Sequence, residues 1–211
     1  MKLAIAFLAA LSLIAADPPL PGLRVEPAPK GSVIYIRNVY TQPLTAFLVE
    51  LVDYPGSRFA YSIDEVTGEG IPPGVEKAYP VSSMLVGAVS PEYVKVQAAV
   101  YDDGTTSGNL GKIVQLFVRR SLTLETTREL IHRIKKSQSK RTPKANLVDD
   151  LKQWLAKLRT ADQEPARAVI ENAATNLNQQ SSDAVLSDLK HIERVIARSK
   201  PVLPRPRPGI E

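Results

Sequence analysis

The sequence contains no cysteine, and only two histidines, two methionines and one tryptophan among 211 residues. The lack of cysteine excludes disulfides, thiol nucleophiles, iron–sulfur clusters and Cys-ligated zinc sites. Neither His132 nor His191 belongs to an HExxH or similar metal-binding spacing, and no Gly-x-Ser-x-Gly elbow occurs. We therefore expect a protein that binds no metal or other cofactor and is not an enzyme.

One enzymatic alternative stays open, an envelope hydrolase or carbohydrate-active enzyme whose carboxylates converge only in the fold. Adjacent carboxylates occur at Asp64-Glu65, Asp102-Asp103 and Asp149-Asp150. Neighbouring side chains on a strand or helix point apart, so none of these is a ready acid–base pair. A cleft holding two carboxyl groups about 5–10 Å apart would favour this alternative.

Residues 1–16 have the order of an export signal, with a basic start, an apolar centre and a small-residue end. Lys2 supplies the charge, residues 3–14 are almost entirely apolar, and two alanines precede Asp17. A membrane-spanning helix needs about 20 apolar residues, so the run is short for a permanent span. We expect cleavage near Asp17 and export of the mature chain to the periplasm, the cell envelope or the medium, with no transmembrane span after cleavage.

Two proline-rich stretches flank the rest of the chain. Residues 17–31 contain five prolines, which favour extended geometry and predict a spacer. Residues 201–211 contain four prolines and two arginines, which predict an extended Pro/Arg-rich tail.

Between residues 32 and 120 the apolar pattern is that of β-strands. Turn sequences rich in Gly, Pro and Asp separate short apolar runs, and Val94 and Val96 alternate with Lys95 and Gln97. The run at 44–53 is apolar on both faces, which is typical of a central strand. The predicted strands lie at about 32–40, 44–53, 58–63, 76–82, 84–89, 93–101 and 112–119.

The strand spacing, the Pro72-Pro73-Gly74 turn and the hairpin sequence at 96–108 resemble the immunoglobulin-like and fibronectin-like sandwiches common in exported bacterial proteins. The paired cysteines and core tryptophan of antibody domains are missing. The resemblance implies an Ig-like β-sandwich over residues 32–120 and a role as an interaction or structural module.

From Ser121 the apolar period changes from 2 to 3.6, which predicts a helical region over residues 121–200. Thr123 and Thr142 are candidate N-caps, and the breaks between apolar stripes are short enough to favour antiparallel neighbours. The predicted helices lie at about 123–137, 143–159, 164–179 and 182–199. The expected fold class is therefore α+β in two parts, an antiparallel Ig-like β-sandwich followed by a small all-α helical hairpin or bundle.

Charge is distributed unevenly, with a net −2 over residues 17–120 and +6 over residues 121–211. Much of the excess lies between residues 128 and 144, where Glu129 is the single acidic residue among seven cations. These seven are our candidate contacts for an anionic partner: Arg128, Arg133, Lys135, Lys136, Lys140, Arg141 and Lys144. The alternative that this segment is a solvated linker stays open.

The expected partner is another envelope protein or an anionic polymer or lipid of the envelope. Nucleic acid is not expected, because the export signal separates the chain from it and aromatic side chains for base stacking are scarce. The sequence leaves the oligomeric state open. Together these patterns predict an exported, non-enzymatic cell-envelope protein that acts as an interaction or structural module.

Overall fold

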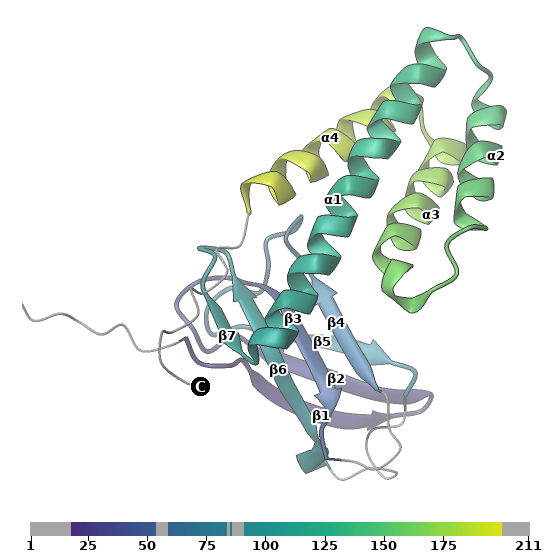
Figure 1. The fold of residues 1–211 in the computed structure, drawn as a ribbon. Coiled ribbons are helices and arrows are strands. Elements are labelled where there is room, and N and C mark those ends of the chain that lie inside the picture. The colour runs from purple at the N-terminus through teal and green to yellow at the C-terminus, as the bar shows by residue number, and fades with distance from the viewer. Residues whose placement is uncertain (1–17, 54–58, 84, 86–90, 200–211) are drawn as a thin grey trace, which may run out of the picture.

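The computed structural model describes residues 18–53, 59–83, 85 and 91–199 (Figure 1). The predicted signal peptide, most of the predicted strand at 84–89 and the Pro/Arg-rich tail lie outside these residues. The described part contains antiparallel strands followed by helices, so the predicted α+β class is confirmed. None of the described helices is long and apolar enough to cross a membrane.

The strands form two antiparallel sheets. The three-stranded sheet has the order β1 (Gly22–Ala28), β2 (Gly31–Arg37) and β5 (Glu76–Val81). The four-stranded sheet has the order β4 (Ala60–Asp64), β3 (Leu44–Leu51), β6 (Val94–Tyr101) and β7 (Thr106–Gly108). A short 3-10 helix, Pro91–Tyr93, precedes β6.

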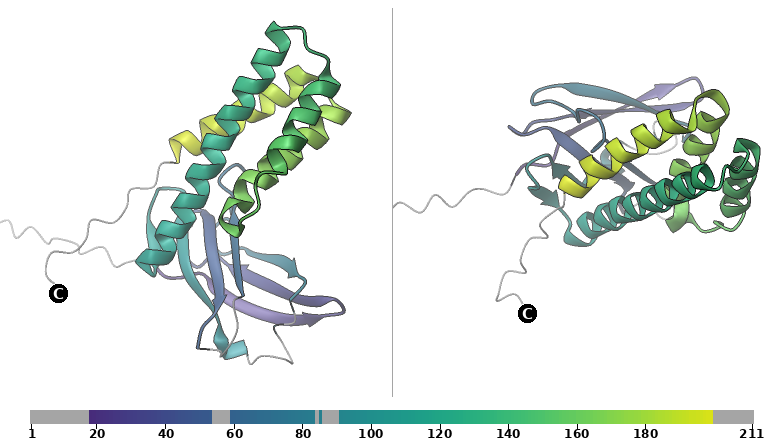
Figure 2. Two further views of the ribbon diagram at one scale, coloured as in Figure 1. Left: turned by 45° about the vertical axis from the view of Figure 1, so that its right-hand side comes forward. Right: turned by 90° about the horizontal axis from the view of Figure 1, so that it is seen from above.

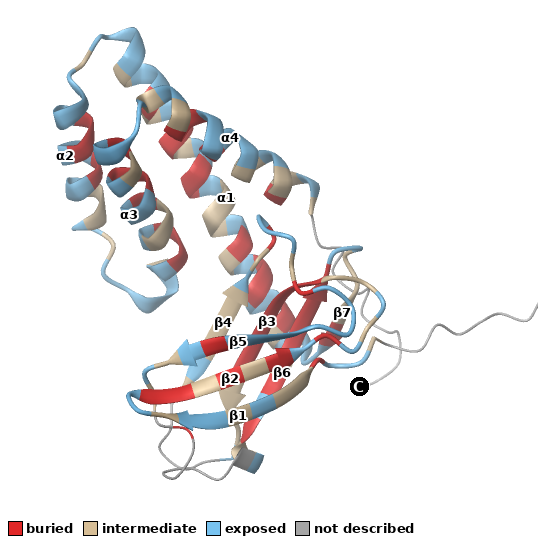
Figure 3. Ribbon diagram, turned by 180° about the vertical axis from the view of Figure 1, so that it is seen from behind, coloured by how far each residue is buried: buried red, intermediate tan, exposed pale blue. Residues whose placement is uncertain are grey.

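The two sheets bury a common apolar cluster. Ile34 and Ile36 from β2 lie in it beside Phe47 and Val49 from β3, all at most 1% exposed. Six consecutive residues of β3 are buried, as the apolar pattern on both of its faces predicts for a central strand. Figure 3 shows the contrast with β1, whose residues are intermediate or exposed because it forms an edge.

The edge strand β1 corrects the prediction of a spacer over residues 17–31. Gly22–Ala28 pairs with β2 along its whole length, from Gly22 opposite Arg37 to Ala28 opposite Gly31. An edge strand tolerates proline because one side of it makes no ladder hydrogen bonds. Pro27 is therefore compatible with a strand in this position.

A long helix, α1 (Leu110–Ser139), covers the outer face of the four-stranded sheet with its first half (Figure 1). Ile113, Leu116 and Phe117 pack there against small and aliphatic side chains of β3 and β6. At the same face, Arg120 donates hydrogen bonds to Asp64 of β4. The helix is thus anchored on the sheet by an apolar contact and a buried ion pair.

The start of α1 shows that the predicted strand at 112–119 is wrong, as is the predicted boundary at 120/121. The helix begins at Leu110, where the Asn109 side chain accepts a hydrogen bond from the backbone N–H of Lys112 at 3.2 Å. Thr123 is not an N-cap, since it lies inside α1 and its hydroxyl donates to the carbonyl of Arg119 at 3.1 Å. Residues 112–119 are rich in strand-forming side chains, but they form a helix because one face of that helix is buried against the sheet.

The remaining helices pack around the second half of α1. They are α2 (Lys144–Leu155), α3 (Glu164–Gln179), which follows the short 3-10 helix Ala161–Gln163, and α4 (Ser182–Arg198). Figures 1 and 2 show α1 as one uninterrupted rod between α4 on one side and the α2–α3 pair on the other. Their apolar stripes meet in a second core that includes Leu130, Leu151 and Leu177.

The N-caps of these helices differ in part from the sequence-based expectation. Pro143, and not Thr142, occupies the N-cap of α2, without a side-chain cap. Ser181 caps α4 by accepting a hydrogen bond from the backbone N–H of Ala184 at 3.2 Å. The predicted helices at 143–159, 164–179 and 182–199 cover the positions of α2, α3 and α4.

Candidate functional site

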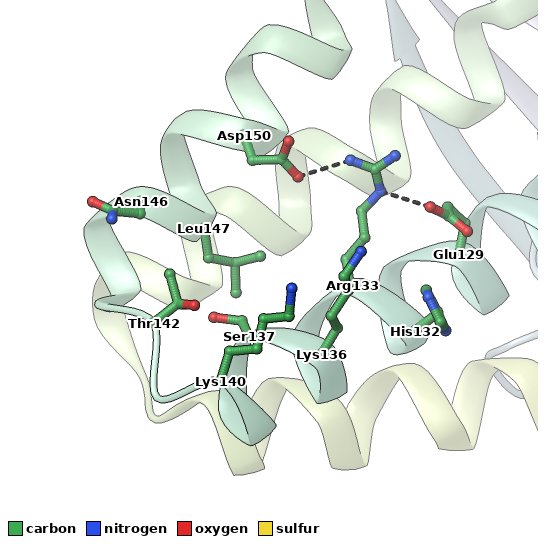
Figure 4. Close-up of a pocket in the computed structure, with 10 residues that line it drawn as sticks. All are labelled: Glu129, His132, Arg133, Lys136, Ser137, Lys140, Thr142, Asn146, Leu147 and Asp150. Atoms are coloured by element: carbon green, nitrogen blue, oxygen red, sulfur yellow. Dashed lines mark hydrogen bonds and ion pairs between the residues drawn. The ribbon is translucent and has the colours of Figure 1, made fainter.

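The predicted basic segment lies where α1 ends and the chain turns into α2. A hollow of about 320 Å³ opens there between the two helices (Figure 4). Arg133 and Lys136 of α1 and Lys140, the C-cap residue of that helix, form one wall, and Asp150 faces them from α2. We call this hollow and the turn beside it the basic corner.

The turn is built by the hydrogen bonds that end α1. The backbone N–H of Arg141 donates to the carbonyl of Gln138, and that of Thr142 to the carbonyl of Ser137, both at 3.0 Å. This pair of bonds is the Schellman motif, whose C′ residue adopts a left-handed conformation. Arg141 occupies that position with φ 53°, where glycine is the usual residue.

Arg133 ties α1 to α2 across the corner. Its Nε donates to Glu129 Oε1 at 2.8 Å and its Nη1 to Asp150 Oδ2 at 2.7 Å (Figure 4). Its guanidinium carbon lies 4.5 Å from the ring centre of Trp154. Partial burial by itself lowers the pKa of Arg133, but the bonds to Asp150 and Glu129 outweigh it and leave that pKa raised. The charge of Arg133 is therefore neutralised within the fold.

Two other predicted contacts also serve the fold. Arg128 Nε lies 3.0 Å from Glu193 Oε1, which joins α1 to α4. Lys144 Nζ donates to the carbonyl of Gln180, just after α3, at 3.2 Å. Together with Arg133, three of the seven predicted cations thus hold helices to one another.

The other four predicted cations, Lys135, Lys136, Lys140 and Arg141, are exposed. Among the described residues, none of them has a carboxylate within ion-pair distance. Lys136 and Lys140 lie one turn apart and line the hollow, whereas Lys135 does not, because neighbouring helical side chains point about 100° apart. The structure therefore brings together Arg133, Lys136 and Lys140 and leaves Arg128, Lys135, Arg141 and Lys144 outside the hollow.

The lining also contains polar residues that were not among the predicted contacts. They are His132 and Ser137 from α1, Thr142 from the turn and Asn146 from α2. Their imidazole, hydroxyl and amide groups can donate hydrogen bonds beside the two lysines. The spacing of His132, Lys136 and Lys140 at i, i+4 and i+8 was the available signal, because it places all three on one helical face.

A second hollow, of about 560 Å³, lies between the edge strand β1 and the first half of β6. Aliphatic side chains, including Leu23, Val94 and Val96, form most of its wall. In the part of the chain that the structure describes, no three His, Asp or Glu side chains gather as metal ligands would. Comparisons of the chain with protein-family models, curated proteins and solved structures found no match.

Proposed function

We propose that this protein is a non-enzymatic binding module of the cell envelope, exported by its N-terminal segment, that binds an anionic partner at the basic corner. The observation that carries the proposal is the position of Lys136 and Lys140. Both line the hollow, both are exposed, and neither has a carboxylate partner among the described residues. Unpaired cations in a recess attract anions and orient hydrogen-bond donors toward them.

The backbone at Arg141 supports this proposal. A non-glycine residue in the left-handed region costs about 1 kcal/mol, and an exposed side chain at this turn offers no packing in return. The arginine adds a third free cation beside Lys136 and Lys140. Glycine at this position would give a more stable turn. A function of the positive charge in binding explains why the position is occupied by arginine.

In this proposal the β part is an Ig-like sandwich that serves as a platform for the helices. Its two antiparallel sheets with a common core support that assignment. The hydrolase alternative needs two carboxyl groups free to exchange protons. The two carboxylates at the corner, Glu129 and Asp150, instead share the guanidinium of Arg133, which favours binding over catalysis.

Binding of fluorescent polyglutamate to the full-length protein, measured by anisotropy, tests the proposal. The Lys136→Gln/Lys140→Gln variant should bind at least about tenfold more weakly, and added salt should weaken wild-type binding steeply. Lys135→Gln is the matched control, since it removes one exposed cation outside the hollow. Equal affinity of the wild type and the double variant would refute the proposal.

A further inference from the structure

The outward face of α1 carries an exposed apolar stripe far from the basic corner. Leu110, Val114 and Val118 are 50%, 39% and 61% exposed and recur at i, i+4 and i+8. They are three of the six large hydrophobic residues that are exposed in the described chain. Aliphatic side chains at this spacing form a ridge of the kind that packs into the groove of another helix.

The apolar stripe and the basic corner share one face of α1. Eighteen residues complete five turns of an α-helix, so Val118 and Lys136 project in the same direction about 27 Å apart. Val114 and His132 are related by the same spacing. Because α1 is uninterrupted between these positions (Figure 2), a straight partner can contact both ends of the face.

Resting on the proposed function, we infer that the anionic partner is a protein and that it docks along this face through an amphipathic helix. One end of that helix carries aliphatic residues that cover Leu110, Val114 and Val118. The other end, about five turns away, carries Asp or Glu residues that meet Lys136 and Lys140. The shared face thus recognises both the negative charges and the apolar residues of the partner.

Charge complementarity argues against a second copy of this chain on the same face. A parallel copy would place lysine against lysine, and an antiparallel copy would place Lys136 against Val118. In addition, three aliphatic residues are far too few for the 1,200 Å² or more that a stable interface usually buries. The apolar stripe therefore adds to a charged contact and does not suffice by itself.

The open edge of the three-stranded sheet is a weaker docking surface. β1 presents Arg24, Glu26 and Pro27, and charged residues and proline are the usual means of blocking edge-to-edge pairing. Arg24 is also held by Glu26 and by Glu76.

Three synthetic helical peptides of about 30 residues test the inference. The first carries a glutamate block and, about five turns away, leucines at i, i+4 and i+8; the second has serines in place of the leucines. The third reverses the order of the two blocks, so that both orientations are sampled. We expect the better of the two leucine-containing peptides to bind the full-length protein about tenfold more tightly than the glutamate-only peptide.

Variants assign this gain to the shared face. Val114→Ser/Val118→Ser should reduce the affinity for the two-part peptide to that for the glutamate-only peptide, whose own affinity should not change. Lys136→Gln/Lys140→Gln should weaken binding of both. Val75→Ser, which removes an exposed valine of the β part, and Lys135→Gln are the matched controls and should have no effect.

The outcomes separate this inference from the proposed function. If the leucines add no affinity, or if Val114→Ser/Val118→Ser leaves the gain intact, the helical partner is refuted while the basic corner stands. If no peptide binds, both proposals fail. Binding to phosphatidylglycerol vesicles that depends on Val114 and Val118, with no gain from the leucine-containing peptides, would identify a lipid surface and overturn the inference.

Discussion

Arg120 and Asp64 are 56 positions apart in the chain and are joined by two hydrogen bonds, from Nε to Oδ2 at 2.7 Å and from Nη2 to Oδ1 at 2.8 Å. Nη2 also lies 3.4 Å from the hydroxyl of Thr45. The arginine side chain is only 4% exposed, whereas that of Asp64 is 25% exposed. A buried cation of α1 is thus satisfied by groups from the sheet, which links the helical part to the β part.

Removing this guanidinium should be costly. Arg120→Met should lower the free energy of unfolding by about 3 kcal/mol, because Asp64 would keep its charge without a cation. Asp64→Asn in the Arg120→Met background should recover part of the loss, and urea unfolding of the four proteins of the cycle measures this coupling.

The adjacent arginine provides the control. Arg119 pairs with Glu164, and the two side chains are 33% and 58% exposed, so both are more exposed than their counterparts Arg120 and Asp64. Arg119→Met should therefore cost less than about 1 kcal/mol. A loss at Arg119 as large as that at Arg120 would show that burial of the Arg120–Asp64 pair is not what matters.

Two glycines should respond very differently to alanine. At Gly108, φ is +101° and an added Cβ would lie 2.3 Å from the carbonyl oxygen of Gln97, so Gly108→Ala should cost about 3 kcal/mol or more. At Gly104, φ is +84° but no atom outside Gly104 and its two chain neighbours lies within 4 Å of the added Cβ, so the cost should be near 1 kcal/mol. Thermal unfolding of both variants compares them, and equal melting temperatures would contradict the close approach at Gly108.

Stability should decline in strong alkali through Tyr101. Burial, and to a lesser extent its neighbour Tyr40, raises the pKa of Tyr101 to about 12. The unfolded chain releases this proton near pH 10 while the folded chain retains it, so stability is fully present below about pH 10 and falls as pH rises toward 12.

The Tyr101→Phe variant isolates this effect. At neutral pH it should be about 1 kcal/mol less stable than the wild type, because it loses the 2.6 Å hydrogen bond from the Tyr101 hydroxyl to the carbonyl of Pro19. As pH rises above about 10 the difference in unfolding free energy should shrink. Parallel pH profiles of the two proteins would exclude Tyr101 as the titrating group.

The contacts of Arg133 that join α1 to α2 can be monitored through the fluorescence of one tryptophan. Trp154 is the one tryptophan of the chain, and it lies against Arg133. Arg133→Lys keeps the charge but loses the planar fork, so it should cost about 1–2 kcal/mol and shift the tryptophan emission. Lys152→Gln, which removes an exposed ion pair with Asp149, should change neither quantity.

The start of α1 shows what the sequence could and could not specify. Residues 112–119 are rich in β-branched and aromatic side chains, and Val114 and Val118 are apolar although they face solvent. With apolar residues on both the buried and the exposed side, a helical stripe cannot be distinguished from a two-sided strand. The packing of Ile113 and Leu116 on the sheet determines that the segment is a helix. That tertiary contact cannot be inferred from the sequence of the segment alone.

Other elements were predictable because their signals were local. The apolar faces of β3 marked a central strand, and the stripes of α2, α3 and α4 marked helices. The seven cations between residues 128 and 144 were found by composition, but composition could not distinguish paired cations from unpaired ones. Asp150 and Glu193, which engage Arg133 and Arg128, come from other helices, so only the packing shows which charges are satisfied.

The unbroken backbone of α1 gives the molecule mechanical continuity. The helix contains no proline, and its hydrogen bonds run from the sheet to the turn at Arg141 without a hinge. A force applied at the turn around Arg141 is therefore transmitted along a stiff helix to the residues of α1 that pack on the sheet. At that end the Arg120–Asp64 pair and the apolar contact of Ile113, Leu116 and Phe117 together hold the helix to the sheet and would resist such a force.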